Sequence, residues 1–325
     1  MTPSTSGRLT SWLGSADVRV FLAGGTGVIG PVLIDRLQAG GHTVIALTRS
    51  DAKAKQLAAV GCEVARGDAL DPETLKRVAV AARPEVIINQ LTSLPKSLMN
   101  PIQANSDGKL TNQLRVLGAP ALAAAARETG ARLIAQSIAF AQKPGSGIRK
   151  EDDPLYLTAP ASHRSVIKAI GILEEATLEA GGVVLRYGHF YGPGTYFAPD
   201  GAYAVMLHKR MLPIVGQGRG SFHMLHLDDA AEATIKAIGA PTGVYNVTDD
   251  VRVTAGDLLP WLAREIGAPV PLRVPPIMFA LGPLTILRYL IDEQPAVSNQ
   301  KAKEALGWLP RYPDWHEPLA ELLRR

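Results

Sequence analysis

The chain has 325 residues, of which 46% are hydrophobic and 20% charged, with a formal net charge of +4. This length predicts one large domain with a smaller annex. Interspersed charges exclude a nucleic-acid-binding arm, and the single cysteine, Cys62, excludes an internal disulfide and a cysteine-based metal site and favours the cytoplasm. No apolar run reaches the length of about 18 residues that a membrane span needs.

Short apolar runs alternate with amphipathic segments through the first half of the chain. In chain order, the patterns predict strand 17–23, helix 28–39, strand 43–47, helix 52–60, strand 62–65, helix 72–82, strand 86–89, helix 110–129, strand 131–136, helix 165–180, strand 183–186, helix 228–238 and strand 243–247. This alternation predicts an α/β fold, a Rossmann-type doubly wound parallel sheet with helices on both faces.

The predicted organisation has a leader, a sheet domain and a substrate region. Residues 1–16 are expected to be a flexible leader, and residues 17–186 a dinucleotide-binding Rossmann domain. From 187 to 325 the chain is richer in proline, glycine and aromatic residues, which is typical of a smaller C-terminal substrate-binding region. Within it, residues 222–250 are expected to return to the Rossmann domain.

A glycine-rich loop follows the first predicted strand. It reads AGGTGVIG, with Gly24, Gly27 and Gly30 in the spacing G-x-x-G-x-x-G. Gly24 permits a tight turn, Gly27 lets the backbone approach a diphosphate, and Gly30 lets the helix pack close to the strand. The helix N-terminus, expected at Val28, then offers free N–H groups and a positive dipole end to the phosphates.

The end of the second strand indicates which dinucleotide binds. An acidic residue there holds the ribose 2′-hydroxyl of NAD, whereas an arginine suits the 2′-phosphate of NADP. Here the strand ends in ALTRSDAK, with Arg49 at its tip and Lys53 one turn later. A guanidinium can bind phosphate oxygens in pairs, so the sequence favours NADP(H) over NAD(H).

In these motifs the chain resembles the extended short-chain dehydrogenase/reductases, which include nucleotide-sugar epimerases, dehydratases and ketoreductases. The similarity runs nearly end to end and includes GCEVARGDALDPETL, VIINQLTS, VVLRYGHFYGPGT, FHMLHLDDAAEA and EALGWLPRY. Together with the loop, it implies a cofactor site built from Gly24, Gly25, Thr26, Gly27, Val28, Ile29, Gly30, Arg49, Lys53, Asp68, Ala69, Leu91, Thr92, Ser93, Lys168, Tyr187, Gly188 and His189. In the family, the residue matching Asp68 reaches the adenine.

The catalytic motif departs from the family pattern. Family members use a serine or threonine with a Tyr-x-x-x-Lys helix, in which the tyrosine exchanges a proton with a carbonyl oxygen and the lysine holds the ribose. In SHRSVIKAIGILEEA the resemblance places Lys168 at the lysine, but Arg164 stands at the tyrosine, and Ser137 takes the serine position. Arginine stays protonated in proteins and cannot donate that proton, although it can stabilise a developing alkoxide. The family's structural asparagine falls near Arg115.

Several groups are candidates for the missing proton source. His163 lies beside the motif but about 100° around the helix, and the alternative is a surface histidine at the helix start. Tyr187 and Tyr191, with His189 and Tyr196, follow the sixth strand, and the alternative for them is aromatic packing under a lid. A third hypothesis needs no side chain, because the acceptor carries its own proton source, such as a phenol beside the ketone, or water serves.

The leading hypothesis is an NADPH-dependent reductase of a ketone or aldehyde on a sizeable, partly apolar substrate. The chain looks like an atypical member of the superfamily, such as an antibiotic-tailoring ketoreductase for aromatic polyketides. A nucleotide-sugar epimerase or dehydratase and a non-catalytic NADP-binding sensor remain as alternatives. The partner expected is a small-molecule substrate, without nucleic acid, membrane or metal, and the family implies a homodimer.

Overall fold

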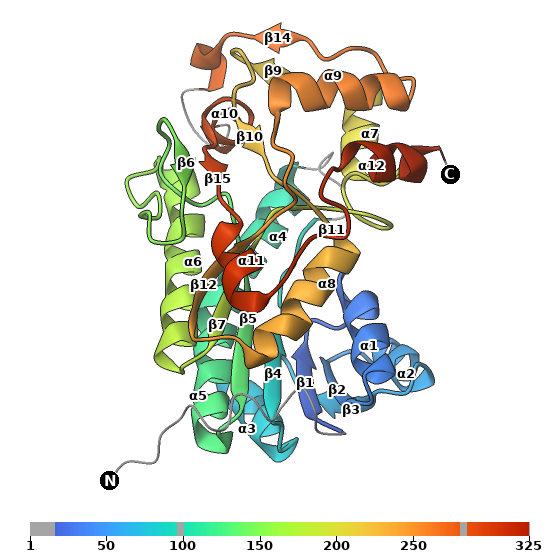
Figure 1. The fold of residues 1–325 in the computed structure, drawn as a ribbon, viewed down its shortest axis with the longest axis vertical. Helices are drawn as coiled ribbons and strands as arrows, with labels where there is room; N and C mark the ends of the chain where they lie inside the picture. The colour runs from blue at the N-terminus through green and yellow to red at the C-terminus, as the bar shows by residue number, and fades with distance from the viewer. Residues whose placement is uncertain (1–16, 96–100, 280–284, 325) are drawn as a thin grey trace.

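The centre of the molecule is a parallel sheet (Figure 1). The computed structural model describes residues 17–95, 101–279 and 285–324, so the predicted leader lies outside the described residues. Within them, seven strands lie in the order β12-β7-β5-β4-β1-β2-β3, and every neighbouring pair is parallel. The strands are β1 Arg19–Ala23, β2 Thr43–Thr48, β3 Glu63–Arg66, β4 Val86–Asn89, β5 Arg132–Ile138, β7 Val183–Tyr187 and β12 Gly243–Val247.

Helices cover both faces of this sheet, which confirms the predicted fold class. One face packs on α1 (Gly30–Ala39), α2 (Asp51–Ala59) and α8 (Leu227–Lys236), and the other on α3 (Pro72–Ala81), α5 (Ala119–Thr129) and α6 (Ala161–Glu179). Because both faces are covered, the central strands carry continuous apolar runs, and all four residues of β4 are buried.

Some predicted boundaries were wrong. Helix α1 begins at Gly30 instead of Val28, and α6 begins at Ala161, directly after Pro160. The predicted helix 110–129 is three elements: α4 (Pro101–Gln113), the π-helical turn η3 (Leu114–Gly118) and α5. The wider turn lies immediately before a proline in the first turn of α5, where the missing N–H interrupts the regular hydrogen-bond ladder.

A second, smaller core lies beyond the carboxyl ends of the strands, at the top of Figure 1. There α7 (Ala202–His208), α9 (Ala255–Glu265) and α12 (His316–Leu323) enclose buried aromatic and aliphatic side chains. The remaining described elements of the chain, in order, are β6 Ile148–Arg149, β8 His189–Tyr191, β9 Ile214–Val215, β10 Ser221–Phe222, β11 Met224–His226, η4 Ala237–Gly239, β13 Val253–Thr254, β14 Arg273–Val274, η5 Pro276–Phe279, α10 Thr285–Arg288, η7 Tyr289–Glu293, β15 Ala296–Val297 and α11 Gln300–Leu306.

The buried carboxylate of Asp229 ties the C-terminal segment to the sheet domain. This residue lies in α8, and its two oxygens accept the backbone N–H groups of Arg311 and Tyr312 at 2.8 and 2.9 Å. The indole of Trp308 donates to the Asp229 carbonyl at 3.1 Å. In the described part of the chain, no helix combines the length and apolar character needed to cross a membrane.

Candidate active site

The glycine loop lies where the chain connections of the sheet change direction. Strands β1 and β4 are neighbours, and the chain leaves them toward opposite faces, through α1 and α4. The N–H of Gln90, just after β4, donates to the Ala23 carbonyl at 2.7 Å. Such a switch point at the carboxyl ends of parallel strands is where open α/β sheets bind ligands.

Two of the three motif glycines are required by geometry. Gly24 has φ +101°, and a Cβ there would lie 2.4 Å from the Gln90 carbonyl oxygen. At Gly30 a Cβ would lie 2.1 Å from the Gly25 carbonyl oxygen, so the helix start packs on the loop backbone. Between them, Thr26, Gly27 and Val28 are exposed at the open surface of the loop, while Ile29 is buried. This shape fits a diphosphate lying across the helix start.

Charged side chains gather at the ends of β2 and β3. Arg49 pairs with Asp68 at 3.0 Å, and the Lys53 ammonium donates to the Thr26 hydroxyl at 3.1 Å. A third cation, Arg66, donates to the Arg49 carbonyl at 3.1 Å and pairs with Asp51. The predicted adenosine-end residues therefore lie together, and sequence reasoning missed Arg66.

The segment after β4 continues from the loop toward the other end of the site. Leu91, Thr92 and Ser93 are half-buried there. The hydroxyl of Thr111, in α4, donates to the Ser93 carbonyl and accepts its N–H, both at 2.9 Å. The carbonyl of Ala69 lies against Gly118 of η3.

Arg164 and Lys168 share an exposed face of α6, as residues four apart should. The Arg164 Nε donates to the Ala159 carbonyl at 2.9 Å, which fixes the root of its guanidinium. His163, one position earlier, is only 4% exposed and packs on Tyr289, with ring centroids 4.5 Å apart. Arg164 and Lys168 therefore lie on the exposed side of α6, whereas His163 lies on its buried side.

Burial lowers the pKa of His163 from 6.5 to about 4, so at neutral pH the ring is not protonated and is a poor acid. Because the unfolded chain binds this proton at a higher pH, the folded state loses stability as pH falls from about 6.5 toward 4. We expect the wild type to lose about 3 kcal/mol more of its free energy of unfolding over this pH range than His163→Phe does.

Urea unfolding of the two proteins at pH 7.5 and 4.5 measures this difference. His208→Phe, at an exposed histidine, is the matched control. Parallel pH profiles for His163→Phe and wild type would contradict the prediction.

Tyr187 and Tyr191 are both fully buried. The Tyr187 hydroxyl lies 2.6 Å from the Thr234 hydroxyl, and burial raises its pKa to about 12. Burial also raises the pKa of Tyr191, whose ring packs against His226. These positions favour the packing alternative over proton donation.

Gly188 and His189 follow β7 but make structural contacts. A Cβ at Gly188 would lie 2.3 Å from the His223 carbonyl oxygen, so a glycine is needed where β8 meets β11. His189 is stacked between Phe140 and Phe222, with ring centroids at 4.2 and 4.5 Å. This stack favours the packing alternative for His189, although Phe140 and Phe222 were not predicted as its partners.

Ser137 lies near the end of β5 and is 1% exposed. Its hydroxyl donates to Oε1 of Glu174 at 2.7 Å, and Glu174 also forms a two-pronged pair with Arg186 at 2.7 and 2.8 Å. Sequence reasoning missed both charged partners. The available signal was Arg186 itself, a charged residue within the apolar strand VVLRY, which indicates a buried counter-ion.

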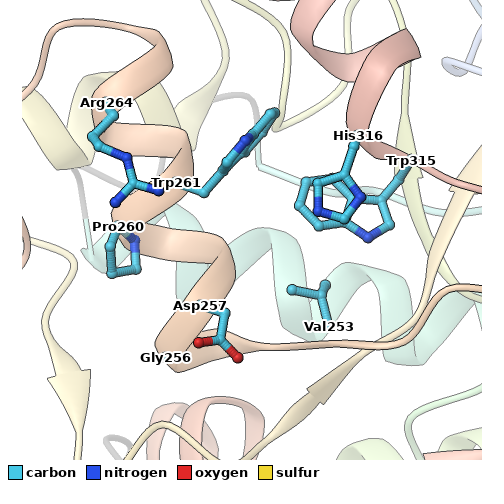
Figure 2. A pocket seen from close by; sticks show the side chains of 8 residues that line it. All are labelled: Val253, Gly256, Asp257, Pro260, Trp261, Arg264, Trp315 and His316. Carbon is cyan, nitrogen blue, oxygen red and sulfur yellow. The ribbon is translucent and has the colours of Figure 1, made fainter.

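A separate pocket of about 350 Å³ lies between α9 and the start of α12 (Figure 2). The rings of Trp261 and Trp315 meet edge to face there, with ring centroids 4.8 Å apart, and Arg264 and Asp257 lie on the α9 side. None of the predicted site residues lines it. Within the described ranges, no three or more histidine, cysteine or carboxylate side chains cluster in a way that would hold a metal ion.

The parallel sheet and the glycine loop at its switch point define a Rossmann-type nucleotide-binding fold. The model of the NAD dependent epimerase/dehydratase family matches residues 20–248. The chain is 40% identical over 311 residues to 3-diazoavenalumate denitrifying reductase from Streptomyces sp, covering 93% of this chain and 99% of that protein. It is 26% identical over 314 residues to UDP-glucose 4-epimerase from Mycolicibacterium smegmatis, covering 90% and 94%.

Solved structures agree on the fold. The Bordetella bronchiseptica enzyme WbmG, in complex with NAD and UDP, has a TM-score of 0.71 at 21% identity and covers 96% of this chain and 94% of its own. The chain belongs to the NAD dependent epimerase/dehydratase family, within the extended short-chain dehydrogenase/reductases. It is an enzyme of the NAD(P)-dependent reductase or epimerase type.

Proposed function

We propose that this protein is an NADPH-dependent reductase that delivers a hydride to an acceptor needing no proton from a side chain. The carrying observation is the exposed pair of Arg164 and Lys168 on α6, with a guanidinium where the family has its tyrosine. Of the other candidate donors, His163, Tyr187 and Tyr191 lie buried in packing contacts. The half-buried Tyr196 donates its hydroxyl proton to the Pro95 carbonyl at 2.9 Å. Each of these side chains belongs to the described part of the chain.

The favoured acceptor is a diazo group on a planar, partly apolar carboxylate. The Streptomyces relative, 40% identical, is named for reducing such a diazo compound with loss of nitrogen. A bound dinucleotide would supply the hydride, which forms a new C–H bond at the diazonium carbon. The electron pair of the C–N bond leaves with N2, so no proton is consumed. A tyrosine is then not needed as a proton donor.

In this proposal the side chains of the protein bind and orient the substrate and the cofactor. The Nε of Arg164 is held by the Ala159 carbonyl, so the terminal N–H groups of the guanidinium remain for a substrate carboxylate. Two of these N–H groups can bind the two carboxylate oxygens side by side. Lys168 lies on the same face for the ribose hydroxyls, as the family resemblance implies. The half-buried ring of Phe140, at one end of its stack with His189, would offer an aromatic wall to a planar substrate. Positioning of this kind can supply about 7–11 kcal/mol of the barrier reduction.

An aromatic ketone remains the second candidate acceptor. A phenol beside the ketone can supply the proton, so no tyrosine is needed, and the planar ring suits the same aromatic wall. The epimerase alternative fits less well, since it needs reversible proton exchange at the position of Arg164. The sensor alternative loses support because the relatives named above are enzymes.

The test is NADPH oxidation with a panel of aryl diazonium carboxylates, matched aromatic ketones and a UDP-sugar, each corrected for the protein-free rate. We expect NADPH-dependent release of N2, with deuterium from labelled NADPH appearing on the product carbon. Tight NADPH binding without turnover of any diazo or ketone acceptor would overturn the proposal, and turnover of the UDP-sugar would favour the epimerase.

For the cofactor, we expect Lys53→Ala to weaken NADPH binding about tenfold and to leave NADH binding unchanged. The reason is that Lys53 lies one helical turn after Arg49, where the 2′-phosphate that NADH lacks is expected, and a hydrogen bond to a charged group contributes about 1.5–3 kcal/mol. Lys55→Ala, an exposed lysine on the same helix, is the matched control with less than about twofold change. Calorimetric titration measures both, and equal losses for NADPH and NADH would contradict NADP preference.

A further inference from the structure

We infer that Arg66, at the end of β3, helps to select NADPH by pairing with Asp51 and so keeping this carboxylate away from the 2′-phosphate. This inference rests on the NADPH preference in the proposed function and deepens it. Arg66 acts through Asp51, so it is a positioning residue.

The charged cluster around Arg66 borders the glycine loop and is open to solvent. Lys53, in the first turn of α2, donates to the hydroxyl of Thr26 in the loop at 3.1 Å. The side chains of Arg49 and Arg66 are 62% and 44% exposed. These cations are therefore accessible to a ligand that lies along the loop.

Two carboxylates lie among these cations, and they are held differently. Asp68 accepts the backbone N–H of Leu70 at 3.0 Å with one oxygen and pairs with Arg49 through the other. The side chain of Asp51 is 92% exposed. Among the described residues, its carboxylate is held by one hydrogen bond, which Arg66 donates at 2.5 Å. The position of Asp51 therefore depends on Arg66.

Arg66 is itself anchored to the turn that follows β2. In the parallel pairing of β2 with β3, Thr48 lies opposite Arg66, so the arginine side chain reaches the neighbouring strand end. The same Nη2 that binds Asp51 donates to the Arg49 carbonyl at 3.1 Å. The guanidinium thus links the two strand ends and holds the Asp51 carboxylate beside itself.

The consequence for the cofactor follows from the charges. With Arg66 present, the three cations of the cluster outnumber the carboxylates of Asp51 and Asp68 by one. Without Arg66 the charges balance, and a released Asp51, two residues after Arg49, would compete with the 2′-phosphate for the remaining cations. An acidic residue in this region instead accepts the ribose 2′-hydroxyl of NADH. Pairing of Asp51 with Arg66 therefore favours NADPH.

The experiment measures calorimetric affinities for NADPH and NADH in Arg66→Met, Asp51→Asn and the double variant. We expect Arg66→Met to weaken NADPH binding about fivefold at low salt, less at high salt, and not to weaken NADH binding. Adding Asp51→Asn should restore NADPH affinity to within about twofold of wild type, because no carboxylate is then released. Arg66→Lys, which keeps the charge, should retain most of the preference.

Arg324→Met is the matched control, because it breaks another exposed pair, with Glu317 at 3.3 Å, and should leave both affinities unchanged. Urea unfolding verifies folding, and the midpoint of Arg66→Met should stay close to that of wild type. Equal losses for NADPH and NADH in Arg66→Met, or an NADPH loss that Asp51→Asn does not reverse, would overturn the inference. A wild type that reduces no acceptor refutes the proposed reductase, whereas reversal of the NADPH loss by Asp51→Asn would still support the role of Arg66.

Discussion

Replacing Gly24 by alanine is expected to abolish useful dinucleotide binding. The added Cβ meets the Gln90 carbonyl 2.4 Å away, at a position whose φ of +101° already disfavours any side chain. Backbone overlap of this kind and the conformational strain together cost about 2–5 kcal/mol. Since the displaced loop is the one proposed to bind the diphosphate, we expect NADPH affinity to fall at least about 100-fold, with a lower urea midpoint.

Gly41 supplies the matched control for that prediction. It also has a positive φ, of +80°, but a Cβ there meets nothing within 4 Å. Gly41→Ala therefore isolates backbone strain, at about 1–2 kcal/mol, and should leave NADPH affinity within about twofold. Calorimetric titration and urea unfolding of the two variants provide the comparison. Equal effects of the two substitutions would show that the contact between the loop and β4 is unimportant.

Breaking the buried ion pair beneath the site is expected to produce the largest loss of stability from a single side chain. Arg186→Met leaves the Glu174 carboxylate 7% exposed without its two-pronged partner. Removing one member of a buried pair typically costs about 3–5 kcal/mol, because the remaining charge is desolvated and uncompensated. We expect the free energy of unfolding to fall by that amount, with Ser137 less firmly held.

The control is the same substitution at an exposed ion pair. Lys76 pairs with Glu128 at 2.8 Å, with side chains 39% and 50% exposed. Water already solvates these charges, so Lys76→Met should change stability far less than Arg186→Met does. Urea unfolding at neutral pH measures both variants. A loss at Arg186 no greater than at Lys76 would contradict the buried-pair argument.

Most of the fold could be predicted because it depends on local patterns. The alternation of apolar strands and amphipathic helices indicated a parallel sheet covered on both faces, and the spacing of Gly24, Gly27 and Gly30 indicated the loop at its switch point. The boundaries that were wrong lie near glycine and proline, at Gly30 and in the break of helix 110–129 at η3. There a single residue changes the hydrogen-bond ladder without altering the hydrophobic pattern.

The chemistry of the candidate site was only partly predictable. Arg164 is visible in the sequence, at the position where the family resemblance implies a tyrosine, and so is Arg49 at the end of the second strand. The partner of Ser137 is not visible, because Glu174 lies 37 positions later and meets it only when α6 packs on β5. The burial of Tyr187 and Tyr191 likewise depends on contacts with α8 and the second core.

The sequence by itself therefore determined the fold class, the spacing of the glycine loop and the presence of an arginine four residues before Lys168, because each depends on residue types at fixed short spacings. Only the tertiary structure decided which hydroxyls and imidazoles are free to act. Burial and hydrogen-bond direction arise from residues far apart in the chain, and these two properties fix where each proton resides.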